Sequence, residues 1–268
     1  MAVTGRDSIA VNITVNIGVN IAVNTAVNIA SKMAGNDPTD LGKESGVTSY
    51  DIAVVGGTGP QGRGLAYRWA RHGHRVVLGS RSAERAEATA AEIARRVPDA
   101  QVSGAANGDA AADAAVVVLA VPYDGHDDLV ASLADALAGK VLISCVNPLG
   151  FDKQGPYALE VPAGSAAESA AGLVPDARVV GAFHHVSAPS LWGSEDYLDH
   201  EDVLVCGDDP EAKAVAVELA RPVTSRDGID AGRLRIARQL EPWTAVLISV
   251  NRRYKTRSGT FISGIPGR

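Results

Sequence analysis

A glycine-rich turn between an apolar run and a helix-like segment constrains the fold of this chain more than any other feature. The run Asp51–Val55 reads DIAVV and is followed by GGTGPQG, in which G-x-G-x-x-G falls on Gly57, Gly59 and Gly62. At a strand-to-helix junction the first glycine permits a tight turn, the second lets a pyrophosphate approach the backbone, and the third lets helix and strand pack closely. The segment therefore predicts a dinucleotide-binding turn.

The donors expected in this turn are mostly backbone groups. The start of the following helix offers free N–H groups and a partial positive charge. Pro60 has no N–H, but a proline at the first helical position loses nothing by that. We expect the amides of Gly59 and Gln61, with the Thr58 hydroxyl, to hold the phosphates. The structural alternative is a glycine turn without a ligand.

The end of the second apolar run indicates which nucleotide is bound. An NAD enzyme usually carries Asp or Glu there, to hold the ribose 2′-OH. This run ends at Ser80 and Arg81 with no acid, and Arg85 follows one helical turn later. A hydroxyl and a guanidinium bind a 2′-phosphate, which a carboxylate would repel. Alternatively, Arg81 and Arg85 are solvated residues of a helix start, although cations are disfavoured there. The pattern favours NADP(H).

Apolar runs alternate with helix-like segments from about Tyr50 onward. Runs such as VVVLAV are apolar throughout, as in strands buried on both faces. The alternation predicts an α/β fold of Rossmann type, with a doubly wound parallel sheet and a C-terminal helical segment. We expect strands at 51–55, 75–78, 114–121, 140–146, 178–183 and 203–206, and helices from the glycine turn to about 72 and at 82–96, 125–138, 164–173, 210–220 and 231–253.

Composition excludes several classes of protein. Hydrophobic residues make up 46% and charged residues 21%, which fits a globular core. The net charge of −6 gives no reason to expect nucleic acid or an anionic membrane as a partner. Cys145 and Cys206 lie at the ends of apolar runs and belong to no metal-binding spacing. We expect buried thiols in a reducing, cytoplasmic setting, and no metal.

The N-terminal region has a different character. Residues 9–30 repeat an asparagine at every fourth position, and residues 34–48 are polar and turn-rich. The tract is too polar for a membrane span and lacks the layout of a signal peptide. It is either an unstructured tail or a translated repeat upstream of a true start at Met33. We expect 1–48 to be a disordered extension and linker, and 49–268 to be an NADP-binding Rossmann domain with a helical extension from about 231.

Three later loops carry candidate site residues. Ligands of a doubly wound sheet lie beyond the carboxyl ends of its strands. Val121 and Pro122 follow one expected strand, Asn147 follows the next, and His184 follows a third. Each also has a purely structural interpretation, since Asn147 suits a turn and a lone histidine is more often structural than catalytic. His184 is favoured because a strand end in the same crevice would place it near the nicotinamide.

Six separated motifs resemble one known family. They read GGTGPQGRGLAYRWARHGH, GSRSAERAEA, CVNPLGFDKQGPYAL, VVGAFHHVSA, VLVCGDDPEAK and LISVNRRYK, and they run in order from about Tyr50 to Lys255. They are similar to the NADPH-dependent F420 reductases, also called F420-dependent NADP oxidoreductases, in an actinobacterial version. The resemblance implies reversible hydride transfer between NADP(H) and the deazaflavin coenzyme F420, and a small soluble homodimer or higher homo-oligomer.

The resemblance also implies roles by position. The nucleotide would be held by two sets of residues, at the pyrophosphate by Thr58, Gly59 and Gln61, and at the 2′-phosphate by Ser80, Arg81 and Arg85. The reacting end would be formed by Val121 and Pro122 beside the ribose and nicotinamide, His184 and Val186 as a shelf for the stacked rings, and Ala188 near the carboxamide.

The sequence departs from the family pattern in three places. Residues 1–48 have no counterpart, and the segment 190–202 and the tail after Lys255 are individual. Pro242 falls inside the last expected helix and predicts a kink or a break. The cations around Arg252 and Arg257 lead to a hypothesis that they steer the anionic tail of the deazaflavin. Alternatively, they complement a helix C-terminus.

Two other functions remain open on the sequence. An NADP-dependent imine or carbonyl reductase of the same superfamily would need a proton donor over its substrate, and a large helical dimerisation domain. A non-catalytic NADP sensor would keep Ser80 and Arg81 but would not need His184 or a second ring pocket. Hydride exchange between two bound cofactors needs only two rings in contact and the exclusion of water.

Overall fold

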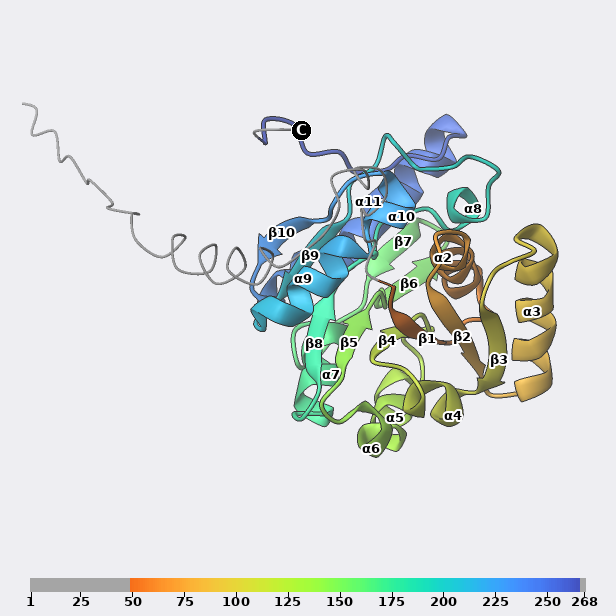
Figure 1. The fold of residues 1–268 in the computed structure, drawn as a ribbon. Coiled ribbons are helices and arrows are strands. Elements are labelled where there is room, and N and C mark those ends of the chain that lie inside the picture. The colour runs from red at the N-terminus through yellow and green to blue at the C-terminus, as the bar shows by residue number, and fades with distance from the viewer. Residues whose placement is uncertain (1–48, 266–268) are drawn as a thin grey trace, which may run out of the picture. The chain divides into compact units, whose positions relative to one another are not determined.

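The structure is a computed structural model that describes residues 49–265. The predictions for residues 1–48 lie outside these residues. The described chain forms one large sheet with helices on both faces (Figure 1). The strands of this sheet are β1 (Asp51–Val55), β2 (Arg75–Ser80), β3 (Val102–Ala106), β4 (Val116–Leu119), β5 (Val141–Ser144), β8 (Arg178–Gly181), β9 (Leu204–Gly207) and β10 (Ile229–Gly232).

The strand order confirms the predicted Rossmann architecture. The sheet runs β10-β9-β8-β5-β4-β1-β2-β3, and the six strands from β3 to β8 are parallel. Their order reverses between β1 and β4, which is where such sheets bind nucleotides. The expectation of a parallel sheet is wrong at one edge. β9 pairs antiparallel to β8, and β10 continues parallel to β9.

Helices cover both faces because successive strand residues point to opposite sides. In β1, Ile52 and Val54 join the hydrophobic cluster under α2 and α3, while Ala53 and Val55 join the cluster under α5 and α7. The helices are α2 (Pro60–Arg71), α3 (Ala83–Arg96), α4 (Asn107–Ala112), α5 (His126–Ser132), α6 (Ala134–Leu137), α7 (Ala166–Leu173), α8 (Ala188–Leu191), α9 (Pro210–Glu218), α10 (Arg221–Thr224) and α11 (Ala237–Tyr254), with a 3-10 turn η1 at Leu234–Ile236.

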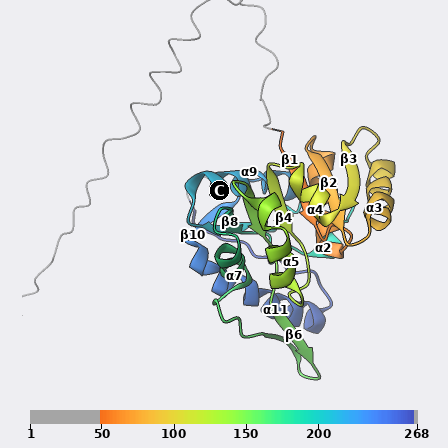
Figure 2. The same cartoon turned by 90° about the horizontal axis from the view of Figure 1, so that it is seen from below.

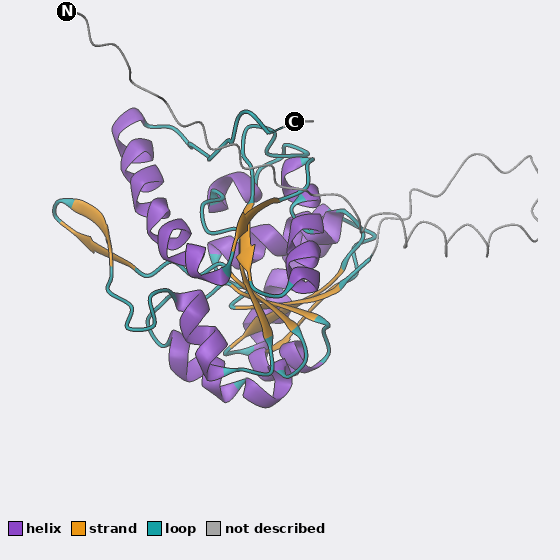
Figure 3. Cartoon of the chain, turned by 90° about the vertical axis from the view of Figure 1, so that its left-hand side faces the viewer, coloured by secondary structure: helices purple, strands orange, loops and turns teal. Residues whose placement is uncertain are grey.

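A small antiparallel hairpin was not predicted. β6 (Leu149–Asp152) and β7 (Gly155–Ala158) pair outside the main sheet, and the hairpin projects from the rest of the domain (Figures 2 and 3). Its turn is closed by the Asp152 carboxylate, which accepts from the amides of Gln154 at 2.7 Å and Gly155 at 3.1 Å. The glycines and the proline of this stretch favour a turn, so the sequence did not predict the two short strands.

Several predicted boundaries are corrected. The helix expected at 125–138 is two helices, α5 and α6, and the helix expected from 231 starts at Ala237 because residues 229–232 form an edge strand. Pro242 does not break α11. It is the sixth residue of the helix, so its missing N–H removes only the bond to Arg238 near the helix start. Burial of Leu240 and Leu247 then holds the helix against the domain.

Candidate functional site

The glycine turn between β1 and α2 is built as its sequence predicts. Gly57 packs so closely that a Cβ there would lie 2.8 Å from the carbonyl of Val54 and 3.0 Å from Cβ of Leu78. At Gly62 a Cβ would lie 2.8 Å from the carbonyl of Gly56 and 2.8 Å from Cα of Gly57. Both positions exclude side chains, because backbone atoms cannot give way. The turn and the helix start are therefore fixed by glycine packing.

Gly59 differs from its neighbours and provides the approach for a ligand. A Cβ at Gly59 would meet nothing nearer than the Gly56 carbonyl at 3.4 Å, so it is an open face of the turn that glycine keeps free. No hydrogen bond within the described chain engages the N–H groups of Gln61 and Gly62 at the start of α2. Free donors beside an open backbone fit a pyrophosphate.

One predicted donor is already engaged. The Gly59 amide donates to the carbonyl of Gly56 at 3.0 Å, which closes the turn, and so it is not free for a phosphate as expected. The Gln61 side chain also has a structural partner, since its Nε2 donates to the carbonyl of Phe183 at 3.1 Å. The phosphate contacts available from this turn are thus the amides of Gln61 and Gly62 and the half-exposed Thr58.

The carboxyl end of β2 carries the predicted 2′-phosphate residues. Ser80 is buried and its Oγ accepts from the amide of Ser82 at 3.3 Å, which leaves the hydroxyl proton to donate elsewhere. Ser82 caps α3 by accepting from the amide of Arg85 at 3.3 Å. Arg81 and Arg85 are exposed, and neither guanidinium forms a hydrogen bond or ion pair with the described residues. Two uncommitted cations at a helix start fit an anionic ligand.

A cavity of 280 Å³ lies between the start of α2 and the ends of β4 and β5. It is lined by Gly59, Pro60, Gln61, Ala120, Val121, Pro122, Cys145 and Asn147. The predicted residues Val121, Pro122 and Asn147 are thus brought together with the glycine turn. Cys145 was not predicted to lie here. Its Sγ donates to the carbonyl of Leu119 at 2.9 Å, and burial raises its pKa to about 12, so it is neither a base nor a nucleophile.

The loop after β8 forms a strained wall beside this cavity. Phe183 is fully buried and has a φ of 62°, which is costly for a bulky residue and is held by its surroundings. The carbonyl of His184 accepts from Asn147 Nδ2 at 2.8 Å and from Thr244 Oγ1 at 2.8 Å. With the bond from Gln61 to Phe183, side chains from three distant segments fix the two carbonyls of this wall.

The predicted shelf residues lie in this wall, but His184 lies deeper than expected. Its imidazole is 2% exposed, and neither ring nitrogen has a hydrogen-bond partner in the described chain. Burial, with a smaller contribution from His185, lowers its pKa to about 3, so the ring is neutral. Val186 is buried as well, and half-exposed Ala188 opens α8. His184 is therefore built as a neutral support and not as a proton donor.

Comparison with known proteins assigns the chain to a family. A family model described as NADP oxidoreductase, coenzyme F420-dependent, matches residues 51–148. An F420-dependent NADP reductase from Methanothermobacter thermautotrophicus is 41% identical over 223 residues, which are 80% of this chain and 95% of the relative. One from Methanocaldococcus jannaschii is 36% identical over 212 residues, 77% and 94% of the two chains. The chain belongs to the F420-dependent NADP reductase family.

A solved structure supports the fold of this F420-dependent NADP reductase family member. A protein from an Arthrobacter species assigned as an F420-dependent NADP reductase shares 32% identity, with a TM-score of 0.68, over 81% of this chain and all of that one. A hypothetical protein from Sinorhizobium meliloti is 26% identical, with a TM-score of 0.55, and the match covers 70% and 86% of the two chains. The Rossmann core and the C-terminal helix are thus shared features.

Three supporting residues of this family member escaped the sequence analysis. Asn107, at the start of α4, accepts from the amide of Gly56 at 3.4 Å and so ties α4 to the phosphate turn. Thr244 holds the His184 carbonyl from α11. Glu241, one turn before it on that helix, accepts from the amides of Ala166 at 2.8 Å and Ala167 at 3.0 Å. Only the asparagine-glycine pair at 107–108 carried a local signal, and it indicates a turn.

Two absences hold for residues 49–265. No three metal-ligating side chains there gather into a site for a metal ion. No helix among those residues has the length and apolar character needed to span a bilayer.

Proposed function

We propose that this protein catalyses reversible hydride transfer between NADP(H) and the deazaflavin coenzyme F420. The observation that carries the proposal is 41% identity to an F420-dependent NADP reductase along 95% of that enzyme's length. A second F420-dependent NADP reductase, from Methanothermobacter marburgensis, is 39% identical over 99% of its own length. The protein is an oxidoreductase with NADP(H) and F420 as its two cofactors.

The glycine turn and the end of β2 are proposed to hold NADP(H). Gln61, Gly62 and Thr58 would bind the pyrophosphate, while Gly57 and Gly59 shape the turn. Ser80, Arg81 and Arg85 would bind the 2′-phosphate, supported by the absence of any carboxylate at Ser80 or Arg81 and by the two exposed guanidiniums. A hydroxyl with two arginines gives charge-assisted bonds that a ribose 2′-OH alone cannot use.

The cavity and the wall after β8 are proposed to receive the reacting ends of both cofactors. Bound together, NADP(H) and F420 supply a hydride donor and a hydride acceptor. The chain would line the nicotinamide with Val121, Pro122 and Asn147, and shape the ring shelf with the backbone at His184, with Val186 and with Ala188. The bonds from Asn147 and Thr244 hold this shelf in place, and the bound rings would displace water from the cavity.

The lack of a titrating group in the cavity separates this reaction from its rivals. An imine or carbonyl reductase must protonate its product, yet among residues 49–265 the one ionisable side chain that lines the cavity is Cys145, whose pKa burial raises to about 12. The neutral His184 is equally unsuited, since burial lowers its pKa to about 3. Hydride exchange between two rings requires no acid from the chain. A non-catalytic sensor would have no use for the strained wall.

We further propose that the enzyme is a cytoplasmic homo-oligomer. The hairpin exposes Phe151 at 58% and Tyr157 at 47%, and Leu159 follows at 37%. Apolar side chains grouped on a projecting hairpin favour contact with a second copy. Two free thiols, at Cys145 and Cys206, suit a reducing compartment. Light scattering after size exclusion should give at least twice the mass of one chain, and Phe151→Asp should lower it. A single-chain mass for the unaltered protein would reject the proposal.

The test of the reaction is direct deuterium transfer. NADPH carrying deuterium at both C4 positions of the nicotinamide is mixed with the full-length protein and oxidised F420, and the visible absorbance of F420 is followed. We expect bleaching, with deuterium recovered in the reduced deazaflavin in ordinary water. Bleaching with solvent hydrogen in the product would contradict direct transfer, and binding of NADPH without bleaching would indicate a sensor.

A further inference from the structure

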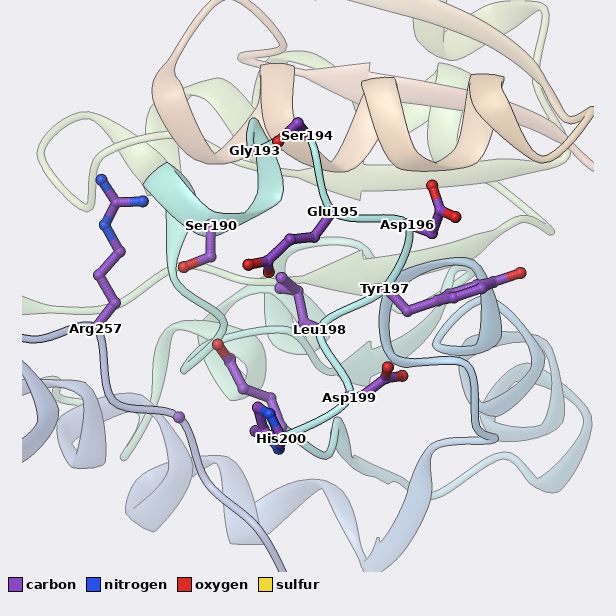
Figure 4. Close-up of a pocket in the computed structure, with 12 residues that line it drawn as sticks. Ser190, Gly193, Ser194, Glu195, Asp196, Tyr197, Leu198, Asp199, His200 and Arg257 are labelled. Carbon is purple, nitrogen blue, oxygen red and sulfur yellow. The ribbon is translucent and has the colours of Figure 1, made fainter.

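A second cavity lies away from the glycine turn, under the irregular segment between α8 and β9. Its volume is 780 Å³, within the range of small-molecule sites. Figure 4 shows Ser190 and Glu195 reaching toward the same space from above, with Leu198 below them and Arg257 on the opposite flank. Asp196 and Tyr197 point away in that view. None of the residues that line it lines the nucleotide cavity.

The upper rim of this cavity is fixed by one buried arginine. Arg68 of α2 has no exposed surface, and its guanidinium donates to two carbonyls at the end of α8, to two carbonyls of the segment after it, and to no carboxylate. The distances are 2.9 Å to Ser190, 2.8 Å to Leu191, 2.6 Å to Glu195 and 2.7 Å to Asp196. A segment without helix or strand is thereby held in one conformation, so the cavity is preformed.

The lower rim is also fixed by hydrogen bonds. Arg226 Nη2 donates to the carbonyls of Asp199 and Glu201, both at 2.9 Å. The tail adds a backbone bond, since the amide of Asp202 donates to the carbonyl of Thr260 at 2.7 Å. Gly259 passes so near that a Cβ there would lie 2.4 Å from Cδ of Glu201. The tail therefore closes one side of the cavity.

Glu201 is the unsatisfied group of this arrangement. It is 6% exposed, it lines the cavity, and its Oε2 has no hydrogen-bond partner among the described residues. Arg226 bonds to its backbone and not to its carboxylate, and Arg257 forms no ion pair with it. A buried carboxylate without a counter-charge is costly, and burial raises its pKa to about 7, offset in part by the amide of Ser187. The site lacks a cation.

Among the other carboxylates of the lining, the exposed Glu195 is the one available to a ligand. Asp196 is paired with Arg71 and Asp199 accepts from Ser225, whereas Glu195 has no ion pair in the described chain. No three metal ligands gather among the described residues, so a compact metal ion does not fit. An ammonium group can donate to carboxylates that lie apart, and a flexible carbon chain can lie against Leu198.

We propose that this cavity binds a small organic cation with one or more ammonium groups, held by Glu201 at its floor and Glu195 at its rim. Binding supplies the counter-charge that Glu201 lacks. The inference does not depend on hydride transfer, because the cavity shares no residue with the nucleotide site.

Proton linkage gives the binding a distinctive pH dependence. The charged or titratable groups around Glu201 come from three regions. The segment supplies Glu195, Asp196, Asp199, His200 and the buried Asp202, the tail and the region beyond α10 supply Arg257 and Arg226, and α2 supplies Arg68 and Arg71. Because the cation selects the ionised form of Glu201, it must displace a proton below pH 7. We expect affinity to fall by about fivefold between pH 7 and pH 6, with proton release on binding.

The test is calorimetric titration of the full-length protein with 1,4-diaminobutane at low salt, in two buffers of different ionisation enthalpy. Uncharged 1,4-butanediol is the ligand control. Glu201→Gln should weaken diamine binding by about tenfold or more, and Glu195→Gln by a few-fold. The matched protein control is Glu211→Gln, which removes the same charge from an exposed site on α9 whose side chain is 87% exposed. It should leave the affinity unchanged.

Folding of the key variant is checked by thermal unfolding at pH 8. Glu201→Gln removes an unpaired buried charge, so its melting temperature should equal or exceed that of the unaltered protein. Absence of a diamine isotherm overturns the proposal. Equal affinity for Glu201→Gln and Glu211→Gln also overturns it, as does equal binding of the diol. Loss of binding in a well-folded Glu201→Gln variant, with buffer-dependent heat in the unaltered protein, supports it.

Discussion

The phosphate turn and the wall after β8 face the same cavity, but they are built in different ways. The turn depends on neighbours in sequence, because the carbonyls that exclude a Cβ at Gly57 and Gly62 belong to Val54 and Gly56. The wall depends on residues far along the chain, since Asn147 and Thr244 reach the His184 carbonyl from 37 and 60 residues away. Damage to the turn should therefore affect folding and nucleotide binding together, whereas damage to the wall should affect chemistry alone.

The largest effect is expected at the third glycine of the turn. Gly62→Ala places a Cβ 2.8 Å from backbone atoms, and overpacking of this kind costs about 1–3 kcal/mol. We expect a lower free energy of unfolding by urea and a large loss of NADPH affinity. Gly59→Ala is the matched control, because its Cβ meets nothing nearer than 3.4 Å. It should fold normally and lose NADPH affinity by about tenfold, through obstruction of the phosphate approach. Equal stability losses in both variants would contradict the distinction.

The next effect concerns the helix that supports the wall. Burial raises the pKa of Glu241 to about 7, with the amides of Ala167 and Ala166 opposing the shift. Since the folded protein then binds this proton more tightly than the unfolded chain, the stabilisation is complete below pH 4.5 and is lost as pH rises through 7.

Urea unfolding at pH 5, 6, 7 and 8 measures this loss. The difference in unfolding free energy between the unaltered protein and Glu241→Gln should change by on the order of 2 kcal/mol between pH 5 and pH 8, because Glu201 and His184 contribute equally to both proteins. His184 works in the opposite direction. Its lowered pKa of about 3 means that its contribution is present above pH 6.5 and is lost as pH falls. Glu211→Gln controls for net charge, and a Glu241→Gln difference that does not change with pH would contradict the assignment to Glu241.

A smaller effect is expected at Thr244, where the two regions can be separated most cleanly. Thr244→Val removes the hydroxyl that donates to the His184 carbonyl at 2.8 Å and keeps the shape of the side chain. The loss of one such bond is about 1 kcal/mol, so we expect a several-fold lower kcat for F420 reduction with unchanged NADPH affinity. Thr89→Val is the control, because that hydroxyl bonds within α3. A change in NADPH affinity equal to the change in kcat would show that wall and turn are not independent.

The smallest effect concerns the cations near the end of α11. Arg252 lies over the ring of Phe151, at 5.7 Å from its centroid, while Arg253 and Lys255 are exposed. If this cluster steers the anionic tail of F420, the KM for F420 should rise a few-fold between 50 and 200 mM salt, through loss of long-range attraction. Arg253→Gln should reduce that salt dependence. A KM for F420 that does not change with salt would reject the steering hypothesis. The cations would then be interpreted as stabilising the C-terminus of α11.

The same contrast explains what the sequence predicted and what it did not. The glycine turn and the acid-free end of β2 are local patterns, and the structure has both of them in place. The sequence analysis did not predict β3, because VSGAA is a partly exposed edge strand of small residues. The reversed direction of β9 and the strained φ of Phe183 have no local signal, because tertiary contacts impose them.

The burial of His184 was also beyond sequence reasoning. A histidine at a strand end was expected to face the rings, but the chain turns its imidazole inward, close enough to Gly181 that a Cβ there would lie 3.1 Å from its Cε1. Only the backbone of His184 is held by the side chains of Asn147 and Thr244. His184 therefore stays a predicted site residue, and we propose that its backbone, not its imidazole, faces the site.

We propose that Arg81 makes the enzyme selective for NADPH over NADH. The most direct test compares the two nucleotides as donors for F420 reduction, in the unaltered protein and in Arg81→Ala. We predict that NADPH is strongly preferred, and that Arg81→Ala lowers kcat/KM for NADPH by about tenfold to a hundredfold while leaving NADH unchanged. Arg95→Ala, an exposed cation at the far end of α3, is the control. Two results would contradict selection of NADPH by Arg81. One is an equal kcat/KM for NADPH and NADH in the unaltered protein, and the other is an unchanged kcat/KM for NADPH in Arg81→Ala.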